Sequence, residues 1–529
     1  MNYIRPDLVI VAYNRSFALL DFNIQDTPEK KFEFMKQTIL ADKSLSSAEK
    51  LVAVRHINLT SDWHNVINNE GVKRICENCQ EECLAVSYCE NCIRNYLKQN
   101  FSNWTSENDN IDNLIQECQL ETSDPEKIVE WIPYNNLENI KYLTKGGFSE
   151  IYIADWIDGS YIKWDNQEQQ LIRNGTKKVI LKKLENVENA NRSWFDEGMS
   201  HLTISSKYNN IVKCHGLTRD PSDGNYMLVM KKMDIDLRKY LQQNYYEITW
   251  KKRIDIVFNV TEALSLIHDE NAIHRDLHSG NILCYRHGQN FYISDLGFCG
   301  PVDRPINSIY GNLPYIAPEV ISGKETTFES DIYSIAMLMW EISSGQPPFI
   351  NFEHDCDLAL KIINGMRPKV IPGTPLEYKK LMEQCWDADP TKRPNIEDLL
   401  HIFKDLPEPR NATEEEQEAY HSSQLSLSIP NKIEDIVSEQ SVNQSKQNYF
   451  TITDDEIKGK SKRIYSEDGN EDLTDNKSKK IKFNNNNVEF QYIQRNYIDN
   501  DDIEEDVISN NPNFHSEDQD ELEIPEDGF

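Results

Sequence analysis

One short stretch, HRDLHSGNIL at residues 274–283, constrains what this chain can fold into more than any other. It follows WKKRIDIVFNVTEALSLIH, whose apolar residues recur at helical spacing, and it precedes a β-like run that contains SDLG. The stretch therefore predicts a polar loop between a long helix and strands. Asp276 in this loop can accept a proton, while Asn281 and Asp295 offer oxygen donors of the kind that Mg²⁺ prefers.

Transfer of a γ-phosphoryl group needs a phosphate cover, a cation, metal ligands and a base. Segments upstream of the loop supply the groups that the loop itself lacks. LTKGGFSEIY at residues 143–152 predicts a strand, a turn and a strand, whose glycines let backbone N–H groups approach phosphates. Lys182 ends the β-like run VILK, and Glu197 in WFDEG is its expected partner. The pattern indicates an enzyme that uses MgATP.

These motifs, in this order, resemble those of the eukaryotic protein kinases. GNLPYIAPE (311–319) is similar to the end of their activation segment, and DIYS (331–334) to the buried aspartate that braces their catalytic loop. CWDADPTKRP (385–394) resembles a signature of the tyrosine and tyrosine-kinase-like kinases. The resemblance implies an α+β fold with a β-rich N-lobe and a helical C-lobe, and transfer of phosphate to a protein hydroxyl, expected to be serine or threonine.

The resemblance also implies a role for each matching residue. The catalytic set is Lys182, Asp276, Asn281 and Asp295, of which the last two would hold Mg²⁺. The expected ATP site consists of Leu143, Thr144, Gly146, Gly147, Phe148, Ser149, Ile151, Ile180, Lys182, Met230, Lys231, Met233 and Leu283. Structural or regulatory roles are expected for Glu197, His274, Arg275, His278, Ser308, Tyr310, Glu319, Asp331 and Arg393.

Two of these expectations concern charge pairs. Glu319 and Arg393 would form a buried structural ion pair. Arg275 would pair with a phosphate on the activation segment, for which Ser308 and Tyr310 are candidates unless they are ordinary loop residues.

The chain departs from the family pattern at the nucleotide. Thr144 and Ser149 replace the outer glycines of the phosphate loop, and Ile180 takes the place of a small residue beside the adenine. A kinase fold that binds partners without catalysis is therefore the alternative hypothesis. The residues of the expected chemistry are nevertheless all present, which favours an enzyme: Lys182, Glu197, Asp276, Asn281 and Asp295.

A further departure lies in the catalytic loop, where His278 replaces the lysine of serine/threonine kinases. An imidazole there would be a conditional cation beside the γ-phosphate, so that lysine at this position would raise the rate at pH 8 by about tenfold. Alternatively, His278 packs or forms hydrogen bonds within the loop as a neutral residue. Neither His278 nor Asn312, which replaces the usual threonine near the end of the activation segment, settles the acceptor class.

Cysteines crowd one short segment, residues 71–98. Two CxxC pairs, Cys76 with Cys79 and Cys89 with Cys92, are separated by a loop short enough to bring four thiolates into a tetrahedron. The spacing predicts a structural zinc site, with Cys83 as a spare, although scattered reduced cysteines are the alternative. Few basic residues lie nearby, so recognition of protein partners is favoured over nucleic acid.

Patterning divides the rest of the chain. Residues 1–70 have helix-like segments with Ser46 or Ser47 as an N-cap and no readable function. Residues 99–136 are expected to be a linker that contains a short helix and leads into a strand, and residues 137–406 form the kinase-like region. The arrangement also resembles, more loosely, kinase-like proteins of mycorrhizal fungi.

Residues 407–529 are expected to be a disordered acidic tail open to protein partners, because they hold 30 Asp or Glu against 12 Lys or Arg and few apolar clusters. Two basic clusters there, 460–463 and 477–482, are either a bipartite nuclear localisation signal or ordinary charge spacing. No apolar run reaches the ~18 residues that span a bilayer. A cytoplasmic or nuclear protein is therefore expected.

Overall fold

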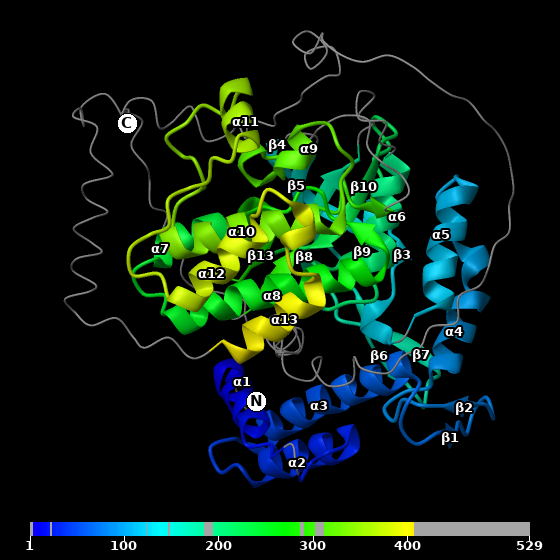
Figure 1. The fold of residues 1–529 in the computed structure, drawn as a ribbon. Helices are drawn as coiled ribbons and strands as arrows, with labels where there is room; N and C mark the ends of the chain where they lie inside the picture. Colours follow the sequence, from blue (N-terminus) through cyan, green and yellow to red (C-terminus); the bar gives the residue numbers. More distant parts are fainter. Residues whose placement is uncertain are drawn as a thin grey trace, which may run out of the picture. The chain divides into compact units, whose positions relative to one another are not determined.

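The computed structural model describes residues 4–21, 24–122, 124–145, 149–184, 194–285, 290–301 and 311–406, with the backbone alone at residues 6 and 7. Gly146, Gly147, Phe148, Ser308, Tyr310, the two basic clusters and the acidic tail lie outside the described residues. Contacts divide the chain into two compact units. The described part of the first unit is 4–93 with 158–177, and that of the second is 94–157 with 178–406 (Figure 1).

The first unit begins with three helices, α1 (Pro6–Ala18), α2 (Pro28–Ala41) and α3 (Ser47–Asn68). Their apolar faces meet in a core that includes Val9, Met35 and Ile57, each fully buried. Ser46 caps α3, because its hydroxyl accepts from the backbone N–H of Glu49 while the Glu49 carboxylate accepts from the N–H of Ser46. The expected N-cap at this position is therefore confirmed.

The cysteine-rich segment folds against α3 within the first unit. It contains a two-stranded hairpin of β1 (Arg74–Ile75) and β2 (Glu82–Cys83), and α4 (Glu90–Gln99) follows it. The buried Asp62 carboxylate of α3 accepts from the backbone N–H groups of Val86 and Ser87, at 2.6 and 2.9 Å. A second hairpin, β6 (Tyr161–Asp165) with β7 (Gln170–Arg173), belongs to the same unit although it is inserted between two strands of the other.

A six-stranded sheet forms the N-lobe of the second unit, in the order β3, β9, β10, β8, β5, β4. Its strands are β3 (Glu130–Trp131), β4 (Leu137–Lys145), β5 (Glu150–Trp156), β8 (Lys177–Lys183), β9 (Cys214–Arg219) and β10 (Tyr226–Lys231). β4 and β5 are the antiparallel pair expected around the phosphate loop. Helix α6 (Trp194–Ser205) lies beside the sheet (Figure 1).

Residues 99–136, expected to be a linker, are instead folded onto this lobe. They include η1 (Phe101–Asn103), α5 (Asp109–Leu120), η2 (Pro125–Lys127), β3 and η3 (Tyr134–Asn136). Ile111 and Ile115 of α5 are fully buried in one apolar cluster with Leu202 of α6. Asp112 of α5 accepts from the hydroxyls of Thr105 and Ser106, so the polar sequence before the helix stabilises its first turn. The segment extends the sheet and covers α6.

The C-lobe is helical. Its helices are α7 (Leu237–Asn244), α8 (Trp250–Asp269), α9 (Pro318–Ile321), α10 (Phe328–Ser344), α11 (Cys356–Ile363), α12 (Leu376–Cys385) and α13 (Ile396–Asp405), with short turns η5 (Ser279–Asn281), η6 (Leu313–Tyr315) and η7 (Pro390–Lys392). The C-lobe also contains short strands, which pair in two small sheets: β11 (Ile235–Asp236), β13 (Ile282–Cys284) and β14 (Phe291–Ile293) in one, and β12 (Ala272–Ile273) and β15 (Gly300–Pro301) in the other.

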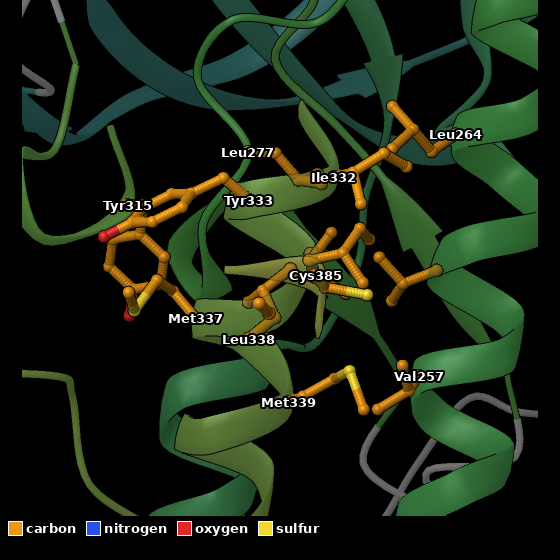
Figure 2. Close-up of a cluster of buried hydrophobic side chains, with 14 of the residues drawn as sticks. Val257, Leu264, Leu277, Tyr315, Ile332, Tyr333, Met337, Leu338, Met339 and Cys385 are labelled. Atoms are coloured by element: carbon orange, nitrogen blue, oxygen red, sulfur yellow. The ribbon is translucent and has the colours of Figure 1, made fainter. Parts of the chain in front are cut away.

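The core of the C-lobe holds the catalytic loop in place. Figure 2 shows side chains of α8, such as Val257 and Leu264, facing those of α10, such as Ile332 and Met339. Leu277, which follows the predicted base Asp276, is buried in the same cluster. One apolar side chain thus anchors a loop whose other side chains are polar. Among the described residues, no helix is both long enough and apolar enough to cross a bilayer.

The junction of β3 and β9 generates a testable prediction. Gly216 of β9 has φ +148°, and a Cβ there would lie 1.8 Å from the backbone oxygen of Glu130 in β3. We expect Gly216→Ala to separate the two strands and to lower the free energy of unfolding by more than about 1 kcal/mol. Gly198→Ala in α6 is the matched control, because its Cβ would meet only Leu184 Cδ1, at 3.8 Å. Chemical denaturation of the full chain measures both, and equal unfolding free energies would contradict the expectation.

Candidate active site

A buried lysine joins three elements of the second unit. The Lys182 ammonium, on β8, lies 2.8 Å from Oε1 of Glu197 on α6 and 2.6 Å from Oδ1 of Asp295 in the SDLG loop. The expected pairing of Lys182 with Glu197 is therefore confirmed. The Lys182–Glu197 pair is shielded from solvent, where opposite charges hold each other more strongly than at the surface, whereas the Asp295 side chain is 32% exposed. The arrangement presents a fixed cation beside an expected metal ligand.

The catalytic loop presents one carboxylate oxygen without a partner. Asn281 Nδ2 donates to the backbone oxygen of Asp276 at 2.9 Å and to its Oδ2 at 3.2 Å. Within the described residues, the other oxygen of Asp276, Oδ1, is buried and has no hydrogen-bond partner. A Cβ on Gly311 would lie 3.0 Å from this oxygen, so glycine keeps the approach to it open. Oδ1 is the atom available to an acceptor hydroxyl.

The backbone of the loop is held by Asp331, as the DIYS motif predicts. The Asp331 carboxylate accepts from the N–H of His274 at 2.8 Å and from the N–H of Arg275 at 3.0 Å, and His268 Nε2 lies 3.0 Å away. Burial would raise the pKa of Asp331, but these hydrogen bonds lower it below its ordinary value. Burial lowers the pKa of His274, which favours the neutral imidazole.

Arg275 contacts the start of the activation segment. Its guanidinium donates to Thr326 Oγ1 at 3.0 Å and to the backbone oxygens of Phe298 and Pro301 at 3.1 and 2.8 Å. The expected contact of Arg275 with a phosphate on Ser308 or Tyr310 stays a prediction, because both of those residues lie outside the described part of the chain.

Several expected nucleotide residues come together between the lobes. Ile180 of β8 pairs with Met230 of β10, and Met233 and Leu283 pack against the same apolar cluster. The contact of these four side chains with an adenine stays a prediction. Thr144 of β4 pairs with Ile151 of β5. Leu143 and Thr144 are exposed, and Ser149 is buried. Lys231, which follows Met230, is partly exposed.

The predicted structural ion pair of the C-lobe is confirmed. Arg393 donates from Nη1 and Nη2 to the two carboxylate oxygens of Glu319, at 2.6 and 2.8 Å, and both side chains are buried. Such two-pronged pairs fix both partners in orientation. The end of the activation segment is thereby tied to the loop before α13.

Sequence reasoning missed a second buried network, which joins four separate elements. The Glu341 carboxylate of α10 accepts from the hydroxyls of Ser279, at 2.8 Å, and Tyr315, at 2.5 Å. Arg238 of α7 lies 3.4 Å from Glu341 and donates to Ser279 at 3.1 Å. No local pattern signals this network, because its members are separated by up to about a hundred residues.

His278 is fixed by the loop itself. The ring is buried, and its Nδ1 accepts from the backbone N–H of Gly280 at 3.1 Å, so that the side chain caps the short turn η5. Its Nε2 lies 3.7 Å from Oδ2 of Asp276. The contact with Gly280 is of the kind expected if His278 forms hydrogen bonds within the loop, and the role of a cation stays a prediction.

Comparison with known proteins identifies the second unit. The family "Protein tyrosine and serine/threonine kinase" matches residues 137–403, half of the chain. The chain belongs to this protein kinase family. "Probable serine/threonine-protein kinase roco8" of Dictyostelium discoideum is 30% identical over 227 residues, which are 40% of this chain and 12% of that protein. The human "Dual serine/threonine and tyrosine protein kinase" is 32% identical over 214 residues, 38% of this chain and 22% of that protein.

The likeness to these two relatives is thus confined to part of each protein. The chain matches less than a quarter of the length of either. The resemblance to kinase-like proteins of mycorrhizal fungi is not tested by them. The family membership implies protein substrates, ATP and Mg²⁺, and it covers the kinase domain alone.

The first unit holds a second candidate site, made of the four predicted cysteines. Cys76 Sγ lies 3.6 Å from Cys92 Sγ, and Cys79 Sγ lies 3.6 Å from Cys89 Sγ, with all four sulfurs within 4.8 Å of one another. Burial would raise the pKa of Cys76, but the N–H groups of Cys79 and Asn78 lower it to about 7. Burial raises the pKa of the Cys92 thiol. Four sulfurs this close together are the donor set that a tetrahedral metal ion prefers, so the residues fit a metal.

The position of His278 generates a prediction about the kinase domain. Asparagine can accept from the Gly280 N–H as an N-cap, whereas alanine and lysine cannot. We therefore expect His278→Asn to keep more activity at pH 8 than His278→Ala or His278→Lys, which lose about 1 kcal/mol of loop stability. Steady-state phosphorylation rates of the three full-length variants measure this. A rate for His278→Lys above that of the wild type would instead favour the cation.

Proposed function

We propose that this chain is an active protein kinase that transfers the γ-phosphate of ATP to serine or threonine hydroxyls of other proteins. The observation that carries the proposal is the position of Lys182, which contacts Glu197 and Asp295 at the same time. Catalysis of phosphoryl transfer consists mostly of positioning and charge stabilisation, so an assembled set of groups is the main requirement.

Each residue of the site has a role in this proposal. Asp276 Oδ1 would accept the proton of the attacking hydroxyl, and the Lys182 ammonium would hold the phosphates of ATP. Asn281 and Asp295 would hold Mg²⁺, which supplies positive charge against the phosphates. Asn281 Nδ2 already donates to Asp276, which leaves its amide oxygen as the atom suited to a metal.

The proposal that the acceptor is serine or threonine is based on the names of two related proteins. One is named a serine/threonine kinase and the other a dual-specificity kinase, so serine or threonine is common to both. Phosphoamino-acid analysis of the products distinguishes these acceptors from tyrosine.

The proposal predicts that one substitution abolishes phosphate incorporation. Asp276→Asn keeps the size of the side chain and can still contact Asn281, but an amide cannot accept the hydroxyl proton. We expect its kcat to fall by about 10²–10⁴-fold, the usual contribution of a positioned base. The measurement uses the full chain with MgATP and a generic protein substrate, because α5 and β3 belong to the N-lobe.

The matched control is Asp405→Asn, an exposed residue at the end of α13, which should leave the rate unchanged. Equal incorporation by wild type and Asp276→Asn would reject the enzyme. The alternative function, a kinase fold that serves as a signalling scaffold, would then be favoured. Ile180 and the altered phosphate loop are the features that favour that alternative.

We further propose that the four-cysteine cluster holds one structural Zn²⁺. Four sulfur ligands within 4.8 Å of one another suit the tetrahedral preference of zinc and leave no open position for catalysis. The metal would then fix the fold of the first unit, whose surface would serve for recognition of protein partners. Cys83 lies close to Cys89 and Glu90 but is outside the four-cysteine cluster.

This proposal predicts one zinc ion per chain by elemental analysis of protein prepared without chelators. Cys79→Ser and Cys89→Ser should lose the metal together with local structure, because metal binding and folding are coupled in such sites. Cys83→Ser is the control and should keep it. Wild-type protein without zinc, or metal loss in the Cys83 variant alone, would contradict the assignment.

A further inference from the structure

A cluster of polar side chains joins α6 to the SDLG loop, and it includes groups of the active site as well as one further residue, His201. Glu197, His201 and Asp295 have ligand atoms within 4.8 Å of one another, an arrangement that resembles a metal site. The cation in this cluster is the Lys182 ammonium, which lies 2.8 Å from Glu197 and 2.6 Å from Asp295. The two ion pairs explain why Lys182, Glu197 and Asp295 lie together. The role of the fourth residue, His201, remains to be explained.

His201 connects α6 to the SDLG loop. It lies four residues after Glu197, one turn along the same face of the helix, and it is completely buried. Its Nε2 accepts a hydrogen bond of 3.2 Å from the backbone N–H of Leu296, which is also completely buried. The backbone of the loop is thus bonded directly to the helix that carries Glu197.

The SDLG loop needs such support because its backbone is in an uncommon conformation. Asp295 has φ +51°, in the left-handed region that costs a non-glycine residue roughly 1 kcal/mol or more. The Gly297 N–H donates to Asp295 Oδ1 at 3.1 Å, and Ser200 of α6 donates to the backbone oxygen of Cys299 at 3.3 Å. Together with the hydrogen bond to His201, these contacts hold the residues that directly follow the expected metal ligand, Asp295.

We propose that His201 is a positioning residue for Asp295. Through the Leu296 N–H, it holds the SDLG loop against α6 in the arrangement that lets Lys182 contact Glu197 and Asp295 together. The effect on the rate rests on the proposed kinase activity, whereas the effect on the loop does not. An apolar residue at position 201 would fill the space but leave a buried N–H without an acceptor, which is costly.

The experiment compares three substitutions in the full chain. His201→Leu removes the acceptor and keeps an apolar side chain, with His201→Met as a second apolar variant if the first fails to fold. His201→Gln restores an acceptor at about the same distance from the backbone. Thr203→Val is the control, because the Thr203 hydroxyl donates to Met199 of its own helix at 2.8 Å and not to the loop.

Two readouts separate positioning from general stability. Hydrogen exchange of residues 294–299 should be faster by about tenfold in His201→Leu, the equivalent of one lost hydrogen bond. The Mg²⁺ concentration that gives half-maximal activity should rise by a similar factor, since Asp295 is the expected ligand. His201→Gln should return both values toward those of the wild type, and Thr203→Val should change neither.

Unchanged exchange of residues 294–299 in the apolar variant, or equal losses in the leucine and glutamine variants, would overturn the inference. If the wild type has no kinase activity, the proposed function fails, while the exchange measurement still decides the role of His201.

Discussion

The active arrangement depends on one buried ammonium group shared by two carboxylates. Lys182 brings a positive charge into a region where it is stable only because Glu197 and Asp295 are both within 2.8 Å. The two carboxylates come from different elements, a helix and a loop, so the ion pairs exist only when both are in place. The rest of the second unit can be understood as the packing that keeps α6 and the SDLG loop in this position.

That packing acts on α6 from two sides. Apolar residues of α5 such as Ile115 bury its outer face, while His201 and Ser200 bind the SDLG loop on its inner side. The sheet fixes Lys182, and Leu277 anchors the catalytic loop in the core of the C-lobe. The ion pairs of Lys182 are thus held in place by the packing of larger apolar surfaces around them.

Much of the site could be predicted from the sequence, because its chemistry demands particular residue types. Phosphates call for a cation such as Lys182, and a hydroxyl proton calls for a base such as Asp276. The Glu319–Arg393 pair was expected because two motifs more than seventy residues apart both match the family. Helix starts were also readable where a capping residue stands before the first turn, as at Ser46. The catalytic residues and the N-cap depend on local chemistry, which short motifs carry, whereas the ion pair was expected from the resemblance of those motifs to the protein kinases.

Other parts were not predictable, because they depend on tertiary contacts. Residues 99–136 are polar enough to suggest a linker. The burial of Ile111, Leu114, Ile115 and Val129, together with the pairing of β3 with β9, makes them part of the fold. His201 occupies a position where helical periodicity indicates core, and its hydrogen bond to Leu296 joins residues about ninety-five apart. The membership of the β6–β7 hairpin in the first unit likewise has no signal in its own sequence.

The edge strand β3 affects where the boundaries of a stably folded kinase fragment can lie. A fragment that begins at residue 137, where the family match begins, would lack β3 and α5 and would expose the hydrogen-bonding edge of β9. Exposed sheet edges and uncovered apolar helix faces promote self-association, so such a fragment would be prone to aggregate. The unit that can be moved between proteins, by recombination or by cloning, is therefore larger than the range that matches the family.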